Sequence, residues 1–143
     1  MTTSASTEPT TTAKMRMPRM PHAVRAAQLL LLVPLGAFQL VATIAFSLII
    51  PMSGKDYFVA VWAPIMAGMC IVTALRFGRG TPRVLGVALG LLAAQTAFSL
   101  VKLLVYGESA ALVFLAVTAA CAGLLALPAS RRHFRQLNAH SAL

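Results

Sequence analysis

The stretch from Ala26 to Ile50 reads AAQLLLLVPLGAFQLVATIAFSLII and contains no charged residue. A helix of this length, rising about 1.5 Å per residue, exceeds the roughly 30 Å of hydrocarbon in a bilayer. The apolar run of a cleaved signal peptide is only about 7 to 15 residues long, so we expect this segment to be retained as a membrane helix. Tilt, or a break near Pro34, would absorb the surplus length, and Pro51 and Gly54 would end the helix.

Three further apolar segments follow the 26–50 span, at 57–75, 84–105 and 109–130. Each reaches the length that a helix needs to cross the bilayer. A membrane barrel would instead show segments of about ten residues with alternating hydrophobicity, which this sequence lacks. The sequence therefore predicts an all-α membrane protein, in which residues 22–130 form a bundle of four transmembrane helices arranged as two hairpins.

The composition excludes a water-soluble enzyme, because 59% of the 143 residues are hydrophobic and only 10% are charged. Twelve Lys and Arg against three acids give a net charge of +9. These basic residues flank the apolar segments, so anionic lipids at the cytoplasmic face of the membrane account for the excess. We therefore expect no nucleic acid partner.

The basic residues are distributed unequally between the two sides of the predicted spans. Only Lys55 and Lys102 lie toward the side of the first and third connections. Because cytoplasmic loops are enriched in Lys and Arg, we expect a multi-pass protein of the plasma or inner membrane with both termini in the cytoplasm. The ten residues on the cytoplasmic side would be Lys14, Arg16, Arg19, Arg25, Arg76, Arg79, Arg83, Arg131, Arg132 and Arg135.

The two ends of the chain differ from the spans in composition. Residues 1–21 are rich in Thr and Ser and then basic, with few large apolar side chains to bury, so we expect a disordered cytoplasmic tail. Residues 131–143 form a second basic cytoplasmic tail that includes Phe134 and Leu137. This segment would either lie along the inner leaflet as a short interfacial helix or fray.

The sequence contains no pattern typical of a catalytic, metal or cofactor site. Cys70 and Cys121 lie singly within spans, whereas a thiol oxidoreductase would need a Cys-x-x-Cys pair. The histidines lie outside the spans, where no pair could ligate a haem across the bundle. Methionines before the first span offer soft ligands for Cu(I), but the arginines among them would repel the ion. We expect no enzymatic activity and no cofactor.

Polar side chains inside the spans carry the functional signal. They recur at helical spacing and form one stripe on each of two spans. Since an unpaired amide in hydrocarbon would cost a few kcal/mol, we expect the stripes to face the bundle interior and Gln39 and Gln95 to be shielded from lipid. The stripes would either join helices by hydrogen bonds or line a hydrated substrate path. Their members are Gly36, Gln39, Thr43 and Ser47 on the first span, and Gln95, Ser99, Lys102 and Tyr106 on the third.

Lys102 is the only charged residue inside a predicted span, about a turn from Gly107. A lysine in mid-membrane costs about 2.5 to 3.5 kcal/mol, but its flexible stem can lift the ammonium toward the outer interface. We expect an ion pair with Asp56 or Glu108 that ties the two hairpins together at their outer ends. The alternatives are contact with lipid phosphate, and an anionic ligand or headgroup held in an outer vestibule.

Small residues recur four apart on the last two spans, a spacing that allows close approach between helices. This pattern favours either tight packing within the bundle or a homo-oligomer. The residues are Gly86, Gly90 and Ala94 on the third span, and Ala119 and Gly123 on the fourth.

The sequence Leu127-Pro128-Ala129-Ser130-Arg131-Arg132-His133-Phe134, within a chain rich in Ala, Val, Leu and Arg, resembles the end of the last span in small four-span membrane proteins from high-GC bacteria. Members of that group are mostly uncharacterised. The resemblance implies a membrane exit followed by a cytoplasmic anchor, and it implies neither a substrate nor a site.

Two functional classes fit the sequence. The first is a non-enzymatic membrane protein that interacts with, or regulates, a membrane partner through its helices. The alternative is a small oligomeric transporter or permease-like protein. Small multidrug transporters of four helices resemble this chain in size, but they rely on a glutamate in the first helix, and the 26–50 span contains no acid.

Overall fold

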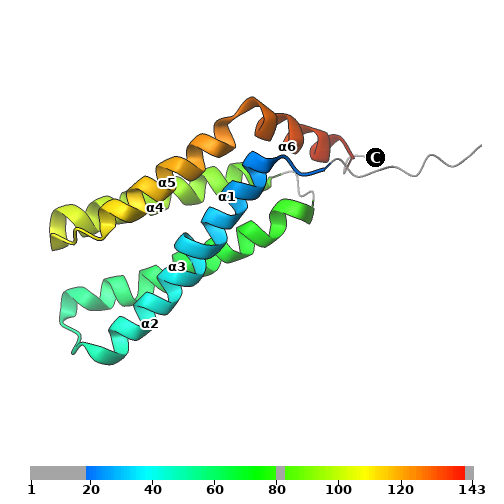
Figure 1. The fold of residues 1–143 in the computed structure, drawn as a ribbon. Coiled ribbons are helices and arrows are strands. Elements are labelled where there is room, and N and C mark those ends of the chain that lie inside the picture. The colour runs from blue at the N-terminus through cyan, green and yellow to red at the C-terminus, as the bar shows by residue number, and fades with distance from the viewer. Residues whose placement is uncertain (1–18, 80–82, 141–143) are drawn as a thin grey trace, which may run out of the picture.

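The computed structural model describes residues 19–79 and 83–140, which form helices and no strand (Figure 1). The predicted all-α fold is confirmed for this part of the chain, whereas most of the predicted tail at 1–21 lies outside the described residues. The elements, in order, are α1 (His22–Leu32), η1 (Val33–Phe38), α2 (Gln39–Ile49), α3 (Gly54–Arg76), η2 (Phe77–Arg79), α4 (Val84–Tyr106), α5 (Ala111–Ala126) and α6 (Pro128–His140).

Among the described residues, three helical segments are long and apolar enough to cross a membrane: His22–Ile49, Asp56–Arg76 and Val84–Tyr106. A fourth results if α5 and α6 are counted as one bent span. Large apolar side chains cover the outer surface of the bundle, and Leu48, for example, is 82% exposed. In water such a surface would aggregate, whereas lipid tails can cover it.

The first membrane helix runs unbroken through α1, η1 and α2. Pro34 lies near the start of η1, which is a stretch of π-helix. Proline has no backbone N–H and its ring collides with the carbonyl of the preceding turn, and a local widening of the helix relieves both problems. The interruption expected near Pro34 is thus a π-helical turn. The helix ends at Ile49, because Ile50 is extended and Pro51 follows.

α3 begins at Gly54, so this residue opens a helix and does not end the preceding one as predicted. Ser53 and Asp56 form a capping box at this end. The carboxylate of Asp56 accepts hydrogen bonds from the backbone N–H of Ser53 at 2.8 Å and from its hydroxyl at 2.7 Å. This reciprocal cap satisfies groups that have no partner inside the helix and extends α3 beyond the predicted start at 57.

α4 ends at Tyr106, and Gly107 then adopts the left-handed conformation with φ of 65°. Glycine takes this conformation without the steric cost that a Cβ would impose. The backbone N–H of Glu108 donates to the carbonyl of Lys102 at 3.2 Å. The turn therefore folds Glu108 back over the last turn of α4.

The predicted fourth span at 109–130 is wrong in its extent, because α5 ends at Ala126 and the chain bends by 65° between α5 and α6. Pro128 lacks the N–H that would bond to the Leu124 carbonyl, and it holds Leu127 in an extended conformation with ψ of 142°. The hydroxyl of Ser130 donates to Leu124 O instead, at 2.7 Å. With 16 residues, α5 spans only about 24 Å.

α6 shows that the segment after the last span is helical and docked, where the sequence left open an interfacial helix or a frayed tail. Ser130, His133 and Phe134 are buried on one side of α6. The ring of Phe134 meets Phe77 edge-on, with 5.5 Å between ring centroids. Arg131, Arg132 and Arg135 are exposed. The basic face of α6 therefore points away from the bundle.

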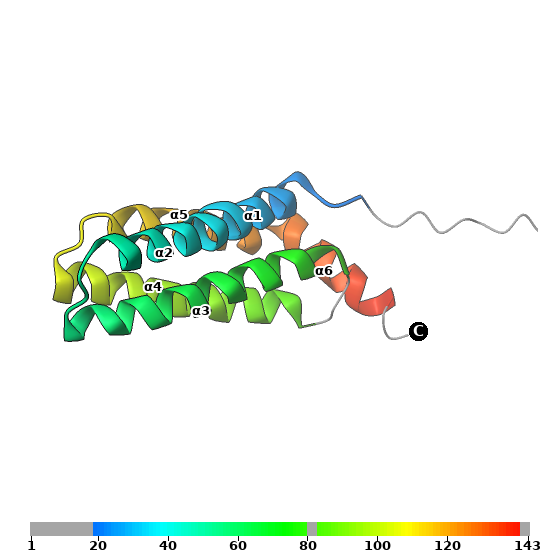
Figure 2. The ribbon, with the colours of Figure 1, turned by 90° about the horizontal axis from the view of Figure 1, so that it is seen from below.

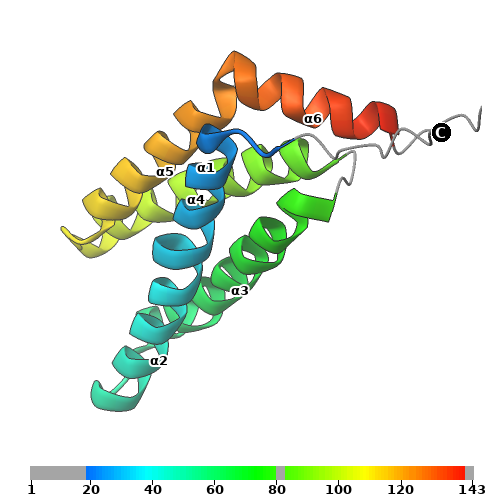
Figure 3. The ribbon, with the colours of Figure 1, turned by 45° about the vertical axis from the view of Figure 1, so that its right-hand side comes forward.

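The helices pack tightly at one end of the bundle and diverge at the other. We call the end at residues 50–53 and 107–110 the loop end, and the opposite end, with α6, the terminal end. α1 packs against α3 and α5, α2 against α3, and α4 against α5. Figures 1 and 3 show the α2–α3 pair separating from the α4–α5 pair toward the loop end, and Figure 2 shows both connections at that end.

The core lies on the terminal side of this divergence. The main cluster of buried apolar residues includes Val24, Ala27 and Leu31 from α1 but no described residue between 36 and 65 or between 93 and 120. Gly36 marks the limit of close packing, because a Cβ there would lie 2.6 Å from Cγ1 of Ile71. Side chains at the loop end are thus left to line a space.

Candidate functional site

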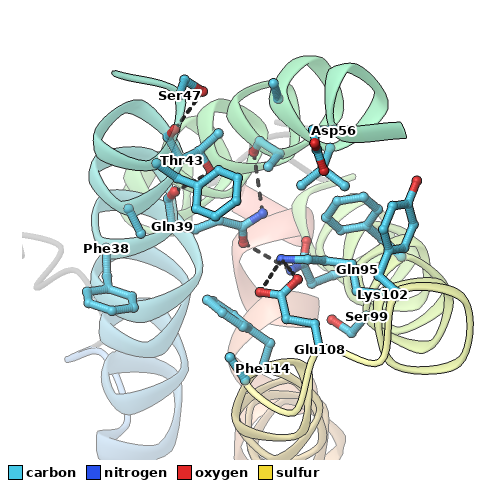
Figure 4. A pocket seen from close by; sticks show the side chains of 18 of the residues that line it. Phe38, Gln39, Thr43, Ser47, Asp56, Gln95, Ser99, Lys102, Glu108 and Phe114 are labelled. Carbon is cyan, nitrogen blue, oxygen red and sulfur yellow. Dashed lines mark hydrogen bonds and ion pairs between the residues drawn. The ribbon is translucent and has the colours of Figure 1, made fainter. Parts of the chain in front are cut away.

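A cavity of about 520 Å³ lies at the loop end, walled by α2, α3, α4 and the start of α5 (Figure 4). Its lining extends from Asp56 and Glu108, beside the connections, to Gln39 and Gln95. Gln95 is the middle residue of α4, eleven residues before Tyr106. At about 1.5 Å per residue, the cavity reaches roughly 16 Å into the bundle.

The inner end of the cavity, which we call the floor, holds a pair of glutamine side chains. Nε2 of Gln95 donates to Oε1 of Gln39 at 3.0 Å, and Nε2 of Gln39 lies 3.4 Å from the carbonyl of Ala63. Gln39 is 5% exposed and Gln95 only 1%. The expectation that both amides are shielded from lipid agrees with this burial. The hydrogen bond joins α2 to α4 across the cavity floor.

One polar atom at the floor is unsatisfied. Oε1 of Gln95 is buried and has no hydrogen-bond partner among the described residues. A buried acceptor of this kind is uncommon in native proteins and carries a desolvation cost of about 1 to 3 kcal/mol. A bound molecule with an N–H or O–H group would recover that cost.

The two predicted polar stripes converge on this cavity. Thr43, Ser47, Ser99 and Tyr106 all contribute to its wall. The hydroxyl of Thr43 donates to Gln39 O and that of Ser47 to Thr43 O, each at 2.8 Å. Because the O–H group of each hydroxyl already donates to a backbone carbonyl, each hydroxyl can only accept a further hydrogen bond from a ligand.

Gly36 is the member of the first stripe that does not line the cavity. It faces Ile71 on α3 and permits the close approach of the two helices. Gly36 thus packs against α3, whereas Gln39, Thr43 and Ser47 of the same stripe line the cavity.

Lys102 forms an ion pair with Glu108, with Nζ 2.7 Å from Oε2 and 2.9 Å from Oε1. This contact agrees with the expectation that Lys102 pairs with one of the two acids. The expected link between hairpins is wrong, because Glu108 follows α4 directly and the pair lies within the α4–α5 connection. Asp56, the partner that would have joined the two helix pairs, is held instead by Ser53.

Aromatic side chains form the apolar part of the wall. Phe38, Phe98 and Phe114 line the cavity, and the rings of Phe38 and Phe114 approach to 6.4 Å between centroids. Trp62, the single tryptophan of the chain, lies behind Phe98 with 6.5 Å between ring centroids. Sequence reasoning missed these residues, because a phenylalanine in an apolar span looks like any lipid-facing side chain.

Other groups of chemical interest lie apart from the cavity. Cys70 and Cys121 are free thiols buried in the terminal-end core, and Sγ of Cys121 contacts the carbonyl of Ala27 at 3.6 Å. Within the described part of the chain, no three His, Cys, Asp or Glu side chains gather where they could hold a metal ion. The cavity is therefore the best candidate site in the described residues.

The chain matches no family of proteins, no curated protein and no solved structure. The site must be interpreted from its own geometry.

Proposed function

We propose that this chain is a small, non-enzymatic, multi-pass membrane protein that binds a small amphipathic molecule in the loop-end cavity. We further propose four spans in two hairpins, with α5 as the fourth span, α6 outside the membrane and both termini in the cytoplasm. The terminal end carries Arg19, Arg25 and Arg76, and the α6 arginines lie there too, which supports this orientation. The cavity then opens toward the outer side of the membrane.

The unsatisfied Oε1 of Gln95 is the observation that carries this proposal. If the glutamines served only to join α2 and α4, no buried acceptor would need to lack a partner on a residue that lines a space of about 520 Å³. A ligand with one donor group would bond to Oε1, and its apolar part would pack against Phe38, Phe98 and Phe114. Ligand sites commonly combine such apolar walls with a few directed polar groups.

Fluorescence of Trp62 offers a direct test, since this residue contacts a cavity-lining ring. The purified protein in nanodiscs is titrated with 4-methylphenol, which has an O–H donor, and with toluene, which has the same shape without one. We expect saturable changes in emission and about 2- to 12-fold tighter binding of the phenol, which corresponds to one hydrogen bond.

Gln95→Leu should abolish this preference for the phenol. Gln28→Leu is the matched control, because Gln28 lies on α1 and donates to Ala74 O at 2.9 Å, away from the cavity. Equal binding of phenol and toluene to the unmodified protein, or a preference that survives in Gln95→Leu, would contradict the proposal.

Helix-mediated interaction with a membrane partner or a second copy of the chain is the second candidate function. Gly86 and Gly90 on α4 and Gly123 on α5 are exposed, and a Cβ added at any of them would meet no described atom within 4 Å. They therefore leave room for an additional helix instead of packing within the chain. Purification in mild detergent would reveal a stoichiometric partner or dimer, and Gly90→Leu should remove it.

A further inference from the structure

The charges that line the cavity restrict the class of ligand. Lys102 is already neutralised by both carboxylate oxygens of Glu108. Asp56 accepts hydrogen bonds from the uncharged Ser53 and forms no salt bridge with any side chain that the structure describes. Among the lining side chains that the structure describes, two carboxylates stand against one ammonium. An anionic ligand, one of the alternatives for Lys102, would therefore meet a neutralised cation and a carboxylate with no described counter-ion.

The aromatic wall also favours a cation. The face of a phenyl ring carries negative electrostatic potential and attracts an ammonium group within about 6 Å of its centroid. Nζ of Lys102 lies 5.9 Å from the centroid of Phe98, so an ammonium already rests near one ring of the cavity. Phe38 and Phe114 contribute further rings to the lining.

Three hydrogen-bonding groups of the wall can only accept. Oε1 of Gln95 is unpartnered, and the hydroxyls of Thr43 and Ser47 have donated to carbonyls of their own helix. A ligand that donates hydrogen bonds and carries positive charge complements this wall. A ligand with acceptors alone would leave Oε1 of Gln95 without a partner.

We propose that the cavity selects small lipophilic amines in their ammonium form, with the charge near Asp56 and the apolar body against the phenyl rings. This inference rests on the proposed ligand-binding function and specifies the charge of the ligand. An ammonium near the loop end stays close to water, so it avoids the cost of a charge at mid-membrane.

Three probes that share a 4-hydroxyphenyl group test the charge preference: tyramine, a cation; 4-methylphenol, which is neutral; and 3-(4-hydroxyphenyl)propionate, an anion. Binding to the full chain in uncharged nanodiscs is followed by Trp62 emission at low salt. We expect tyramine to bind about 3- to 10-fold tighter than 4-methylphenol, and the anion to bind weaker than both. High salt should reduce the difference.

Two substitutions should move the affinity for tyramine in opposite directions. Asp56→Asn removes a negative charge from the lining and should weaken binding about 3- to 10-fold, whereas Lys102→Met frees Glu108 and should strengthen it by a similar factor. Ser53→Ala is the control for Asp56→Asn, because it disturbs the same helix cap and keeps the carboxylate. Affinity for 4-methylphenol should stay unchanged in Ser53→Ala, and in the other two variants it should change less than the affinity for tyramine does.

Equal affinities for tyramine and 4-methylphenol, with no effect of Asp56→Asn, would overturn the preference for cations and leave the proposed function intact. Loss of tyramine binding in Ser53→Ala as large as in Asp56→Asn would assign the effect to the helix cap and also overturn it. Absence of binding by all three probes would overturn both proposals.

Discussion

The hydrogen bond between Gln39 and Gln95 joins two residues that lie 56 positions apart in sequence. Each amide offsets part of the desolvation free energy of the other. If one amide is lost, the other stays buried without this compensation. Hydrogen bonds between membrane helices contribute on average only about 0.6 kcal/mol, because the separated helices also find partners. The pair is therefore better suited to positioning the floor of the cavity than to holding the bundle together.

We expect Gln39→Leu to lower the free energy of unfolding by about 1 kcal/mol, because Nε2 of Gln95 then lacks its acceptor. The double variant Gln39→Leu/Gln95→Leu should lose less than the sum of the two single losses, by about 0.6 kcal/mol. Unfolding in mixed micelles measures all three values. Strictly additive losses would mean that the two amides do not interact.

The ion pair between Lys102 and Glu108 should appear as coupling within one connection. We expect an interaction energy of about 0.2 to 1 kcal/mol between Lys102→Met and Glu108→Gln, a small value because the Glu108 side chain is 42% exposed. The corresponding cycle for Lys102→Met and Asp56→Asn should be additive. Coupling between Lys102 and Asp56 would show that the lysine bridges the two helix pairs after all.

Sequence reasoning at this scale located the polar residues but not all of their partners. Helical spacing alone placed Gln39, Gln95 and Lys102 on interior faces. The choice of Glu108 over Asp56 depends on the left-handed turn at Gly107 and on the Ser53 cap, which are local backbone events that spacing does not encode. The lack of a partner for Oε1 of Gln95 depends on how far α2 and α4 separate, which only tertiary packing determines.

The π-helical turn lies where the helices begin to diverge, and Gly36 within it allows close contact with α3. Gly36→Ala places a Cβ 2.6 Å from Cγ1 of Ile71, so we expect a loss of about 1 to 3 kcal/mol in the free energy of unfolding. Gly90→Ala is the matched control, because a Cβ there meets nothing within 4 Å. That variant should be neutral or stabilised by up to about 1 kcal/mol through helix propensity. Equal behaviour of the two variants would contradict the close contact.

Docking of α6 should depend on pH through His133. Burial lowers the pKa of this imidazole below its ordinary value of 6.5, so docked α6 favours the neutral form. Its contribution to docking is fully present above that pH and falls as the pH drops toward the lowered pKa. We expect α6 to become more susceptible to protease as the pH falls from about 7.5 to about 5.5. His133→Gln should show a smaller change, and an identical change in both proteins would exclude this residue as the cause.

The sequence predicted the helices well where the length of an apolar run determines their bounds. It predicted them less well where single residues determine the bounds. The segments at 26–50, 57–75 and 84–105 correspond to long helices because apolar runs of that length have few alternatives. The fourth segment failed because Pro128 and Ser130 together end α5 and begin α6. In a run of apolar and small residues, a proline at that place is as typical of the end of a span as of a bend between two helices.

At the scale of the whole molecule, orientation in the membrane is the property most open to direct measurement. We expect reporter fusions at Leu143 to be active in the cytoplasm, and insertions near Gly54 to be active on the outer side, because ten of the twelve Lys and Arg precede the first span, follow the last or connect the second and third. A cytoplasmic signal near Gly54 would invert the topology and place the cavity on the inner side.

The cavity also changes how an electrical potential would act on the protein. Water that entered the cavity from the loop end would conduct ions far better than the packed core around Val24, Leu31 and Leu125. Most of a transmembrane voltage would then fall across the thinner terminal half of the bundle, where the field would be steeper. A charge crossing the whole membrane changes energy by about 2.3 kcal/mol per 100 mV, and a charge moving within the cavity crosses only a small part of that drop. Occupancy of the site would consequently respond weakly to membrane potential. Motion of the helices around the π-helical turn, in contrast, would move the peptide dipoles of that turn through the steepest part of the field.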